Sequence, residues 1–325
     1  MKISIALAAY NGEKFLPDQL ASFASQTRLP DELIVTDDGS TDGTIPIIEA
    51  FAIAAPFPVR LEINKKNLGY AQNFSHAISL CTGDLVFLSD QDDVWMDKKI
   101  EYMTSLAEKN PEKACLINNT WLCDGNLVSS NQTKLDRILS AGLEETDFVM
   151  GCCMALRKNF LHLVLPVPES MPSHDNWIAG LADNMELTLR LQKPLQYYRL
   201  HAGNTSDFFV NTVSKPNIVV RSSKKLFRLI QRFSSYSGFR QELQLCKELV
   251  CRLESNQTVC EDLVGKKRMI ELLHIRQSFL RLLAERDRVI RKKTIDRPRA
   301  VLALWCKGGY QSRLGALKDL LVLKK

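Results

Sequence analysis

The chain has 325 residues, of which 45% are hydrophobic and 25% are charged. This ordinary globular composition allows one large domain or two smaller ones, each with a real core. No apolar run approaches the roughly 20 residues that cross a bilayer, so the sequence speaks against a membrane-spanning protein.

The net charge of +6 is distributed very unevenly along the chain. Residues 1–214 carry 17 Lys and Arg against 27 Asp and Glu, and residues 215–325 carry 26 against 10. The two parts therefore have net charges of −10 and +16. An acidic part suits cations and a basic part suits an anionic surface, which indicates two modules with different tasks.

The cysteines and the N-terminus indicate a cytoplasmic protein. The nine cysteines contain no C-x-x-C pair, and Cys152 and Cys153 are adjacent. This pattern is neither a disulfide framework nor a zinc site, so we expect a reducing compartment. The apolar run from Ile3 to Ala9 ends at Tyr10, which is too early for a signal peptide, and we expect it to form a strand.

Strand-like and helix-like segments alternate from the N-terminus onward. Strands are predicted at 3–9, 32–36, 59–63 and 84–89, and helices at 14–25, 45–55, 71–81 and 97–109. Such alternation predicts an α/β fold with a mainly parallel sheet flanked by helices. The alternation stops after Pro216, so we expect an α/β domain over 1–214 and a basic, mainly helical domain over 215–325.

Polar clusters follow three of the predicted strands, where ligands bind in parallel sheets. They begin at Tyr10, Asp37 and Ser89. No G-x-G-x-x-G or G-x-x-x-x-G-K-[ST] motif is present, which removes the usual support for dehydrogenase and P-loop functions. Asp90 and Asp92 form a D-x-D that could bridge a divalent cation to a diphosphate, although Asp is also common in solvated turns after strands.

The segment from Asp38 to Glu49 offers an alternative function. Its residues match an EF-hand calcium loop at Asp38, Ser40, Asp42, Gly43 and Glu49. An EF-hand loop follows a helix, however, and residues 32–36 are strand-like. A nucleotide pocket at a strand-to-helix turn uses the same residues as hydrogen-bond acceptors.

Four motifs in order resemble the family 2 glycosyltransferases. They are A-A-Y-N-G-E from Ala8, D-D-G-S-T-D-G-T from Asp37, N-L-G-Y-A-Q-N-F from Asn67 and L-S-D-Q-D-D-V-W from Leu88. Later segments also agree: Gly151–Ala155 looks like the strand leading to the acceptor region, His174–Trp177 like the motif of the catalytic base, and Tyr198–Asn204 like a closing segment. The resemblance covers about residues 1–206 and implies a GT-A fold, inversion at the anomeric carbon, and Mn or Mg.

The resemblance also implies roles for individual residues. Asp38 would contact the nucleotide base, Asp90 the ribose and diphosphate, and Asp92 the metal ion. Ala8 and Tyr10 would line the base pocket, Asn67 and Gly69 would lie on the next nucleotide-proximal loop, and His201 would complete the metal site. Without the family, His201 reads equally well as a surface residue, and Asp93 as a metal ligand or a helix cap.

Asp175 is the expected catalytic base, which accepts the proton of the attacking acceptor hydroxyl. The alternative is a cap for the helix through Trp177. Many family members have Glu-Asp where this chain has His174-Asp175. Together with L-S-D-Q-D-D-V-W, this pair most resembles the rhamnosyltransferase-like branch that builds bacterial surface polysaccharides such as O-antigen, with a deoxyhexose donor such as dTDP-rhamnose.

The basic C-terminal part contains Lys224–Ile230 and Phe279–Lys293, where apolar and basic residues interleave at helical spacing. Such helices could hold the protein at the inner face of the cell membrane, near a saccharide or lipid-linked acceptor. They could equally pack on one another with a basic face in water. No nucleic-acid-binding signature is present, so no nucleic-acid partner is expected. The rival to an enzyme is an inactive calcium- or saccharide-binding module.

Overall fold

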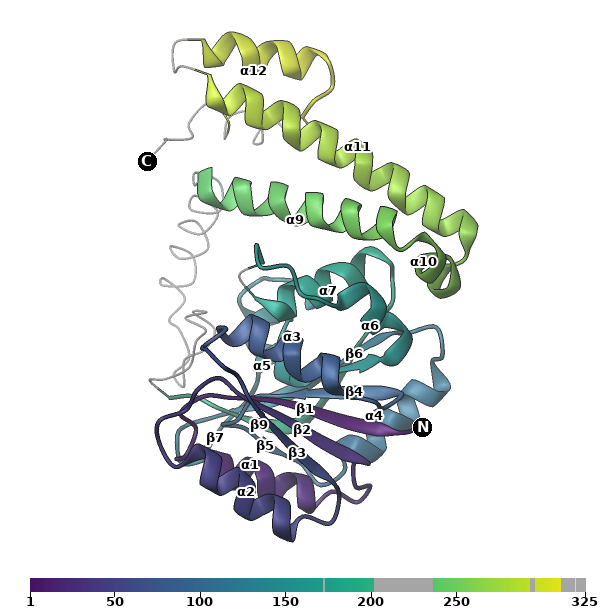
Figure 1. The fold of residues 1–325 in the computed structure, drawn as a ribbon. Coiled ribbons are helices and arrows are strands. Elements are labelled where there is room, and N and C mark those ends of the chain that lie inside the picture. Colours follow the sequence, from purple (N-terminus) through teal and green to yellow (C-terminus); the bar gives the residue numbers. More distant parts are fainter. Residues whose placement is uncertain (172, 202–235, 293–295, 311–318, 320–325) are drawn as a thin grey trace. The chain divides into compact units, whose positions relative to one another are not determined.

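The computed structural model describes residues 1–325 except 172, 202–235, 293–295, 311–318 and 320–325. The chain forms two compact units, Met1–Lys215 and Pro216–Lys325. The first unit contains a nine-stranded sheet, and the second contains helices (Figure 1).

The strands share one sheet, in the order β3-β2-β1-β4-β8-β6-β9-β5, with β7 paired to β6. Their bounds are β1 Ile3–Ala9, β2 Glu32–Asp37, β3 Val59–Ile63, β4 Leu85–Ser89, β5 Val94–Trp95, β6 Cys115–Cys123, β7 Ser129–Thr133, β8 Met154–Arg157 and β9 Thr188–Arg199. The four strands β1 to β4 are parallel, whereas β8 runs antiparallel to both of its neighbours.

Helices flank this sheet and make up the second unit (Figure 1). In the first unit they are α1 Leu16–Ala24, α2 Thr44–Ala54, α3 Tyr70–Leu80, α4 Lys99–Lys109, α5 Lys134–Ser140, α6 Lys158–Val164 and α7 His174–Asn184, with 3₁₀ turns at Glu145–Asp147 and Gly151–Cys153. In the second unit they are α9 Tyr236–Ser255, α10 Gln257–Val264, α11 Lys266–Arg291 and α12 Arg297–Cys306.

The alternation in the sequence predicted this fold correctly. The α/β architecture, with a mostly parallel sheet flanked by helices and followed by C-terminal helices, is confirmed. The predicted strand at Gly151–Ala155 is wrong in part, because residues 151–153 form a 3₁₀ turn and β8 begins at Met154. Among the described residues, no helix has the length and apolar character needed to cross a membrane.

Strands β1 and β4 are apolar almost throughout because helices cover both faces of the sheet. On one face, the core joins side chains of α1, α2 and α4 to alternate residues of the strands. Phe23 of α1 is fully buried there. Its ring packs edge-on against the Trp95 ring, with ring centroids 4.7 Å apart. This packing fixes the loops at the carboxyl ends of β1 and β4.

We predict that Phe23→Ala lowers the free energy of unfolding by about 3–5 kcal/mol, because it removes a buried aromatic ring and leaves a cavity. Urea denaturation, monitored by tryptophan fluorescence, measures this change. The matched control is Ile53→Ala, since the Ile53 side chain on α2 is 90% exposed. It should change stability by about 0.5 kcal/mol or less. Equal effects of the two substitutions would contradict the assigned core.

Candidate functional site

The carboxyl ends of β1, β2 and β4 meet at one edge of the sheet. In the strand register, Ala9 lies beside Asp37, and Leu7 lies beside Ser89. The polar clusters after these strands are therefore neighbours in space, although about thirty and fifty residues separate them in the chain.

Asp38 joins the loop after β2 to the loop before α3. Its buried carboxylate accepts the backbone N–H groups of Leu68 at 2.7 Å and Gly69 at 2.9 Å, and the side-chain amide of Asn64 at 2.9 Å. Asn67 donates to the Asp38 carbonyl oxygen at 3.1 Å. Gly69 has φ +81°, which favours glycine. Three of the predicted nucleotide-binding residues thus form one hydrogen-bonded turn.

Tyr10 is joined to the loop after β4 by Gln91. The Gln91 side chain accepts the Tyr10 N–H and donates to the Tyr10 carbonyl, both at 2.9 Å. A side chain on Gly12 would meet Gln91 Oε1 at 2.2 Å, so glycine leaves room for this contact. The Tyr10 ring is 48% exposed, and Ala8 is half-buried below it. Both residues are placed at the edge where Asp38 lies.

The structure excludes the EF-hand alternative. A strand, β2, precedes Asp38, where an EF-hand requires a helix. Asp42 binds the Glu13 and Thr44 backbone N–H groups, and Asp38 binds the loop before α3. These carboxylates are directed to separate loops and do not converge on one cation.

Asp92 and His201 lie side by side, as the resemblance implies. His201 Nε2 is 2.8 Å from Asp92 Oδ2, and both side chains are partly exposed. The imidazole also packs on the Phe15 ring, with centroids 4.7 Å apart. Two groups that bind divalent cations well thus share one place at the sheet edge.

Asp93 has a different environment from Asp92. It is fully buried and accepts the Gln196 amide at 2.9 Å and the Arg199 backbone N–H at 3.2 Å, both from β9. It caps no helix, since Lys98 is the N-cap of α4. Asp93, Asp90 and Cys152 also place potential ligand atoms within 4.8 Å of one another. The strand already engages Asp93, and a hydrogen bond with Cys153 together with burial raises the pKa of the Cys152 thiol, which disfavours a thiolate ligand.

Negative charge is concentrated around Asp90. Burial and the neighbouring Asp92 and Asp175 raise the pKa of Asp90 to about 7. Burial, Asp92 and Asp90 also raise the pKa of Asp93. Neighbouring carboxylates repel one another when both are ionised, and a bound cation offsets this repulsion. The electrostatics of the cluster therefore fit a divalent metal ion.

Lys99 is the buried cation behind this cluster. Its Nζ donates to the Cys152 carbonyl at 3.1 Å and to the Gln196 side chain, and it lies 3.9 Å from the centre of the Trp95 ring. Burial lowers its pKa to about 8. The side-chain amide of Gln196 connects Lys99 to Asp93: its Oε1 accepts from Lys99 Nζ, and its Nε2 donates to Asp93 Oδ2.

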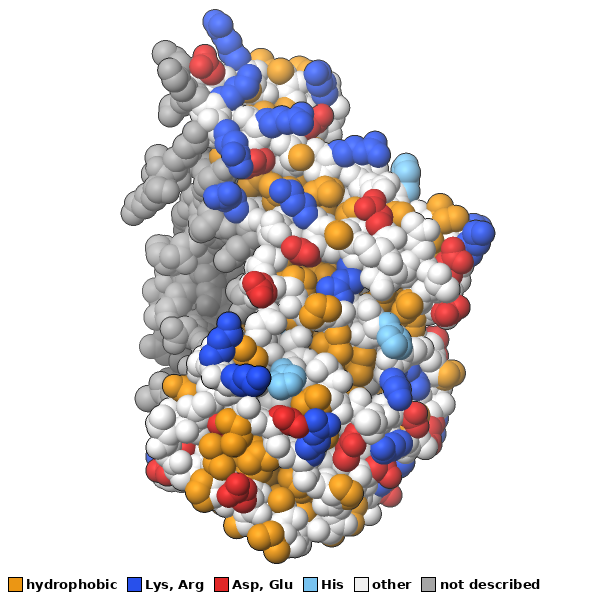
Figure 2. Space-filling model, viewed as in Figure 1, with side chains coloured by type: hydrophobic (Ala, Val, Ile, Leu, Met, Phe, Trp, Pro, Cys, Tyr) orange, Lys and Arg blue, Asp and Glu red, His pale blue; other side chains and the backbone are white. Residues whose placement is uncertain are grey.

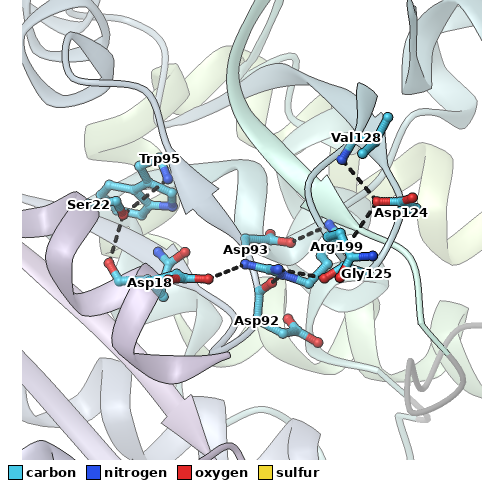
Figure 3. Close-up of polar contacts among 11 residues, drawn as sticks. Asp18, Ser22, Asp92, Asp93, Trp95, Asp124, Gly125, Val128 and Arg199 are labelled. Atoms are coloured by element: carbon cyan, nitrogen blue, oxygen red, sulfur yellow. Dashed lines mark hydrogen bonds and ion pairs between the residues drawn. The ribbon is translucent and has the colours of Figure 1, made fainter. Parts of the chain in front are cut away.

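Arg199 holds the Asp92 loop in place (Figure 3). Its guanidinium donates to the Asp92 carbonyl at 2.9 Å, the Gly125 carbonyl at 2.8 Å and the Asp18 carboxylate at 2.8 Å. Its side chain is 4% exposed and packs over the Phe15 ring. Arg199, Lys99 and Gln196 were not predicted as site residues, because nothing in their spacing distinguishes them from surface polar residues.

Asp175 lies in the first turn of α7, and Ser173 is the N-cap of that helix. Asp175 is thus not the cap. Its carboxylate accepts the neighbouring Asn176 N–H at 2.8 Å and is partly exposed. Its charge contributes to the raised pKa of Asp90, which brings α7 and the loop after β4 into one site.

A cavity of about 720 Å³ lies along α3, beside Asn67. Gln72, His76 and Glu169 are among its polar lining residues. Asp90, Asp92 and Asp175 are not among its lining residues, so the cavity adjoins the predicted nucleotide loop without containing the carboxylates.

We predict that, with a chelator present, the stability of Asp90→Asn relative to that of wild type increases as the pH rises from 5 to 8. Between the ordinary pKa of 3.8 and about 7, the folded wild type keeps a proton that the unfolded chain has lost, so rising pH removes stability. Asn does not titrate. The difference in Tm should grow by a few degrees.

Thermal unfolding at both pH values measures this difference. Asp97→Asn is the matched control, since it removes one exposed carboxylate near the same loop. A Tm difference for Asp90→Asn that stays constant between pH 5 and pH 8 would refute the raised pKa.

Comparison with known proteins finds a family model that matches this part of the chain. The model of glycosyl transferase family 2 matches residues 4–163. An uncharacterized glycosyltransferase of Nostoc is 26% identical over 215 residues, covering 63% of this chain and 66% of that protein, slightly less than two thirds. The dTDP-rhamnosyl transferase RfbG of Shigella flexneri is 25% identical over 218 residues, covering 61% and 72%.

A solved structure shares the fold. The crystal structure of S. aureus TarS 1–349 in complex with UDP has a TM-score of 0.53 and 18% identity, covering 96% of this chain and 93% of that one. At this identity the likeness establishes the fold alone.

Proposed function

We propose, on the premise that residues 4–163 match glycosyl transferase family 2, that the protein transfers a sugar from a nucleotide-diphosphate donor to an acceptor hydroxyl, with inversion. One observation carries the proposal. Asp92 lies 2.8 Å from His201, and the charges of Asp92 and of Asp175, from two distant segments, act on Asp90, at the edge of the sheet that holds the Asp38 turn. This arrangement suits a metal-bound diphosphate next to a general base.

The donor nucleotide would lie along the ends of β1 and β2. Ala8 and Tyr10 would border the base, and Asp38 would accept from it with the Oδ2 lone pair that its Asn64, Leu68 and Gly69 donors leave free. The turn at Asn67 would close the other side. Asp90 would lie against the ribose and diphosphate.

Asp92 and His201 would hold a divalent ion, Mn or Mg, with Asp90 nearby. When bound, such an ion offsets the charge that develops on the departing diphosphate. The protein's part is to keep Asp92 oriented, which Arg199 does through the Asp92 carbonyl. Positioning residues of this kind commonly change metal affinity tenfold or more.

Asp175 would accept the proton of the acceptor hydroxyl while that oxygen forms the new bond to the anomeric carbon. The bond from that carbon to the diphosphate oxygen breaks on the opposite face, so the configuration inverts. A partly exposed carboxylate in the first turn of a helix can receive a proton and release it to water.

The donor sugar is proposed to be a deoxyhexose such as rhamnose, and the acceptor a saccharide or lipid-linked saccharide of a surface polysaccharide. The His174-Asp175 pair and the similarity to RfbG support this choice. Donor specificity depends on pocket shape, so a screen of nucleotide sugars is the direct test.

We predict that Asp175→Asn and Asp92→Ala fail in different ways. Wild type should be stabilised by one nucleotide sugar with Mn in a thermal-shift screen and should turn it over. Asp175→Asn should keep donor binding but lower kcat by about 10²-fold, because it loses only the base. Asp92→Ala should lose the Mn dependence of both binding and turnover.

Asp97→Asn, which changes an exposed carboxylate, should leave both measurements unchanged. Asp93→Ala is not a suitable control, since it would leave buried donors of β9 without an acceptor. Normal kcat in Asp175→Asn would exclude the base, and Mn-dependent turnover in Asp92→Ala would exclude the metal site. A chain that binds but never turns over any donor would be an inactive binding module.

We also propose that residues 215–325 bind an anionic membrane face, with charge as the main attraction. The stretch 224–230 lies outside the described residues. In the stretch that begins at Phe279, Leu283 and Ile290 are fully buried and pack in a cluster with Phe239 and Leu243 of α9. The apolar side chains of this stretch of α11 are thus already packed against α9. Exposed basic residues remain, and Figure 2 shows Lys and Arg side chains scattered over these helices.

Charge-driven binding should be reversible and sensitive to salt, with about 1 kcal/mol for each basic residue near the surface. We predict that full-length protein sediments with phosphatidylglycerol vesicles at low salt and much less at high salt. Lys266→Glu/Lys267→Glu on α11 should weaken binding, whereas Lys65→Glu/Lys66→Glu in the acidic unit, the same charge change, should not. Equal effects, or equal binding to neutral vesicles, would refute this proposal.

A further inference from the structure

Tyr70 occupies a distinctive place between the donor-side loop and the helix of the proposed base. It is the first residue of α3 and directly follows Gly69, whose backbone N–H donates a hydrogen bond to the Asp38 carboxylate. The Tyr70 ring is 43% exposed, yet its edge meets the His174 ring of α7, with centroids 6.0 Å apart. The side chain is therefore directed toward the helix that carries Asp175, while its backbone belongs to the Asp38 turn.

His174 supports this ring from below. It is 4% exposed, and its imidazole stacks on Phe74 at 4.0 Å with an interplanar angle of 23°. On another side lies Gly151, where an added Cβ would come within 2.3 Å of His174 Nε2. His174 thus fills the space between α3, the 3₁₀ turn at Gly151–Cys153 and α7. A residue wedged in this way has little freedom to move.

The buried His174 imidazole is best described as an uncharged ring that fills space. Neither of its ring nitrogens has a hydrogen-bond partner in the part of the chain that the structure describes. Burial lowers its pKa, which favours the uncharged imidazole. A buried polar ring without partners carries a cost, so its presence here calls for a compensating role.

Resting on the proposed function, we propose that Tyr70 is an acceptor-positioning residue, with its exposed ring forming the platform for the acceptor sugar and His174 fixing that ring beside Asp175. A pyranose has an apolar C–H face that packs on an aromatic ring, and the Tyr70 ring offers such a surface. The platform would orient the acceptor so that its attacking hydroxyl meets the base, which is the geometric contribution that catalysis needs.

Two observations favour an acceptor contact over a nucleotide contact. The Tyr70 ring packs on α7, whereas the residues proposed for the nucleotide base lie at Tyr10 and Asp38, after β1 and β2. The pKa of Tyr70 is raised by burial, then by the charge of Asp175 and further by that of Asp90. The phenol therefore lies close enough to both carboxylates to feel their charge, at the place where donor and acceptor would meet.

The test separates sugar binding from nucleotide binding in the same preparations. Calorimetry measures the Kd for UDP, dTDP and GDP with Mn. Saturation-transfer NMR on the nucleotide-loaded protein then measures binding of the methyl glycosides of rhamnose, glucose, galactose, mannose and N-acetylglucosamine. Tyr70→Ala should weaken the bound glycoside about tenfold or more and change the nucleotide Kd less than about twofold. Tyr70→Phe should retain most of the affinity because it keeps the ring.

Two further variants make the pattern specific. Tyr10→Ala, on the nucleotide side, should weaken the nucleotide and leave the glycoside nearly unchanged. His174→Ala should weaken the glycoside like Tyr70→Ala while the nucleotide Kd is kept, an effect that general destabilisation would not produce.

Three results would overturn the inference: Tyr70→Ala binding glycosides as wild type does, Tyr70→Ala losing nucleotide and glycoside equally, or nucleotide-loaded wild type binding no glycoside of the panel. Failure of wild type to bind any of the three nucleotides would instead overturn the proposed function, on which this inference rests.

Discussion

The site depends on the way the chain tolerates three carboxylates within four residues after β4. Burial and the mutual repulsion of Asp90, Asp92 and Asp93 raise the pKa of Asp90 and of Asp93. The two nearby buried cations have other partners: Lys99 binds Gln196 and the Cys152 carbonyl, and Arg199 binds two carbonyls and Asp18. Hydrogen bonds thus hold the loop in place, and the raised pKa of Asp90 fits the proposed cation site.

The adjacent residues Asp92 and Asp93 have different roles because their side chains point in different directions. Asp93 points into the protein and accepts from β9, so it anchors the loop to the sheet. Asp92 points outward to His201, which comes from the end of the same strand region. Strand β9 therefore supplies the anchor for Asp93, and His201, two residues after its end, is the partner of Asp92, so a shift of β9 would disturb both contacts.

The second half of the site is held by shape more than by charge. Asp38 fixes the Gly69 turn through backbone N–H groups, and the turn sets the start of α3. From α3, Phe74 and Tyr70 reach the His174 ring on α7. The proposed nucleotide loop and the helix of the proposed base are thus connected by packed side chains, which would link donor binding to the geometry at Asp175.

The sequence by itself determined the alternation of strands and helices, the α/β fold and the clusters after β1, β2 and β4, because hydrophobic period and chain order are local properties. It predicted Asp92 and His201 as neighbours through a family resemblance. Only the tertiary structure decided that Asp93 faces β9, that Arg199 and Lys99 are buried, that Leu283 and Ile290 pack against α9, and that Tyr70 meets His174. The physical reason is that orientation, burial and charge coupling arise between residues far apart in the chain, and spacing within one sequence carries no record of those contacts.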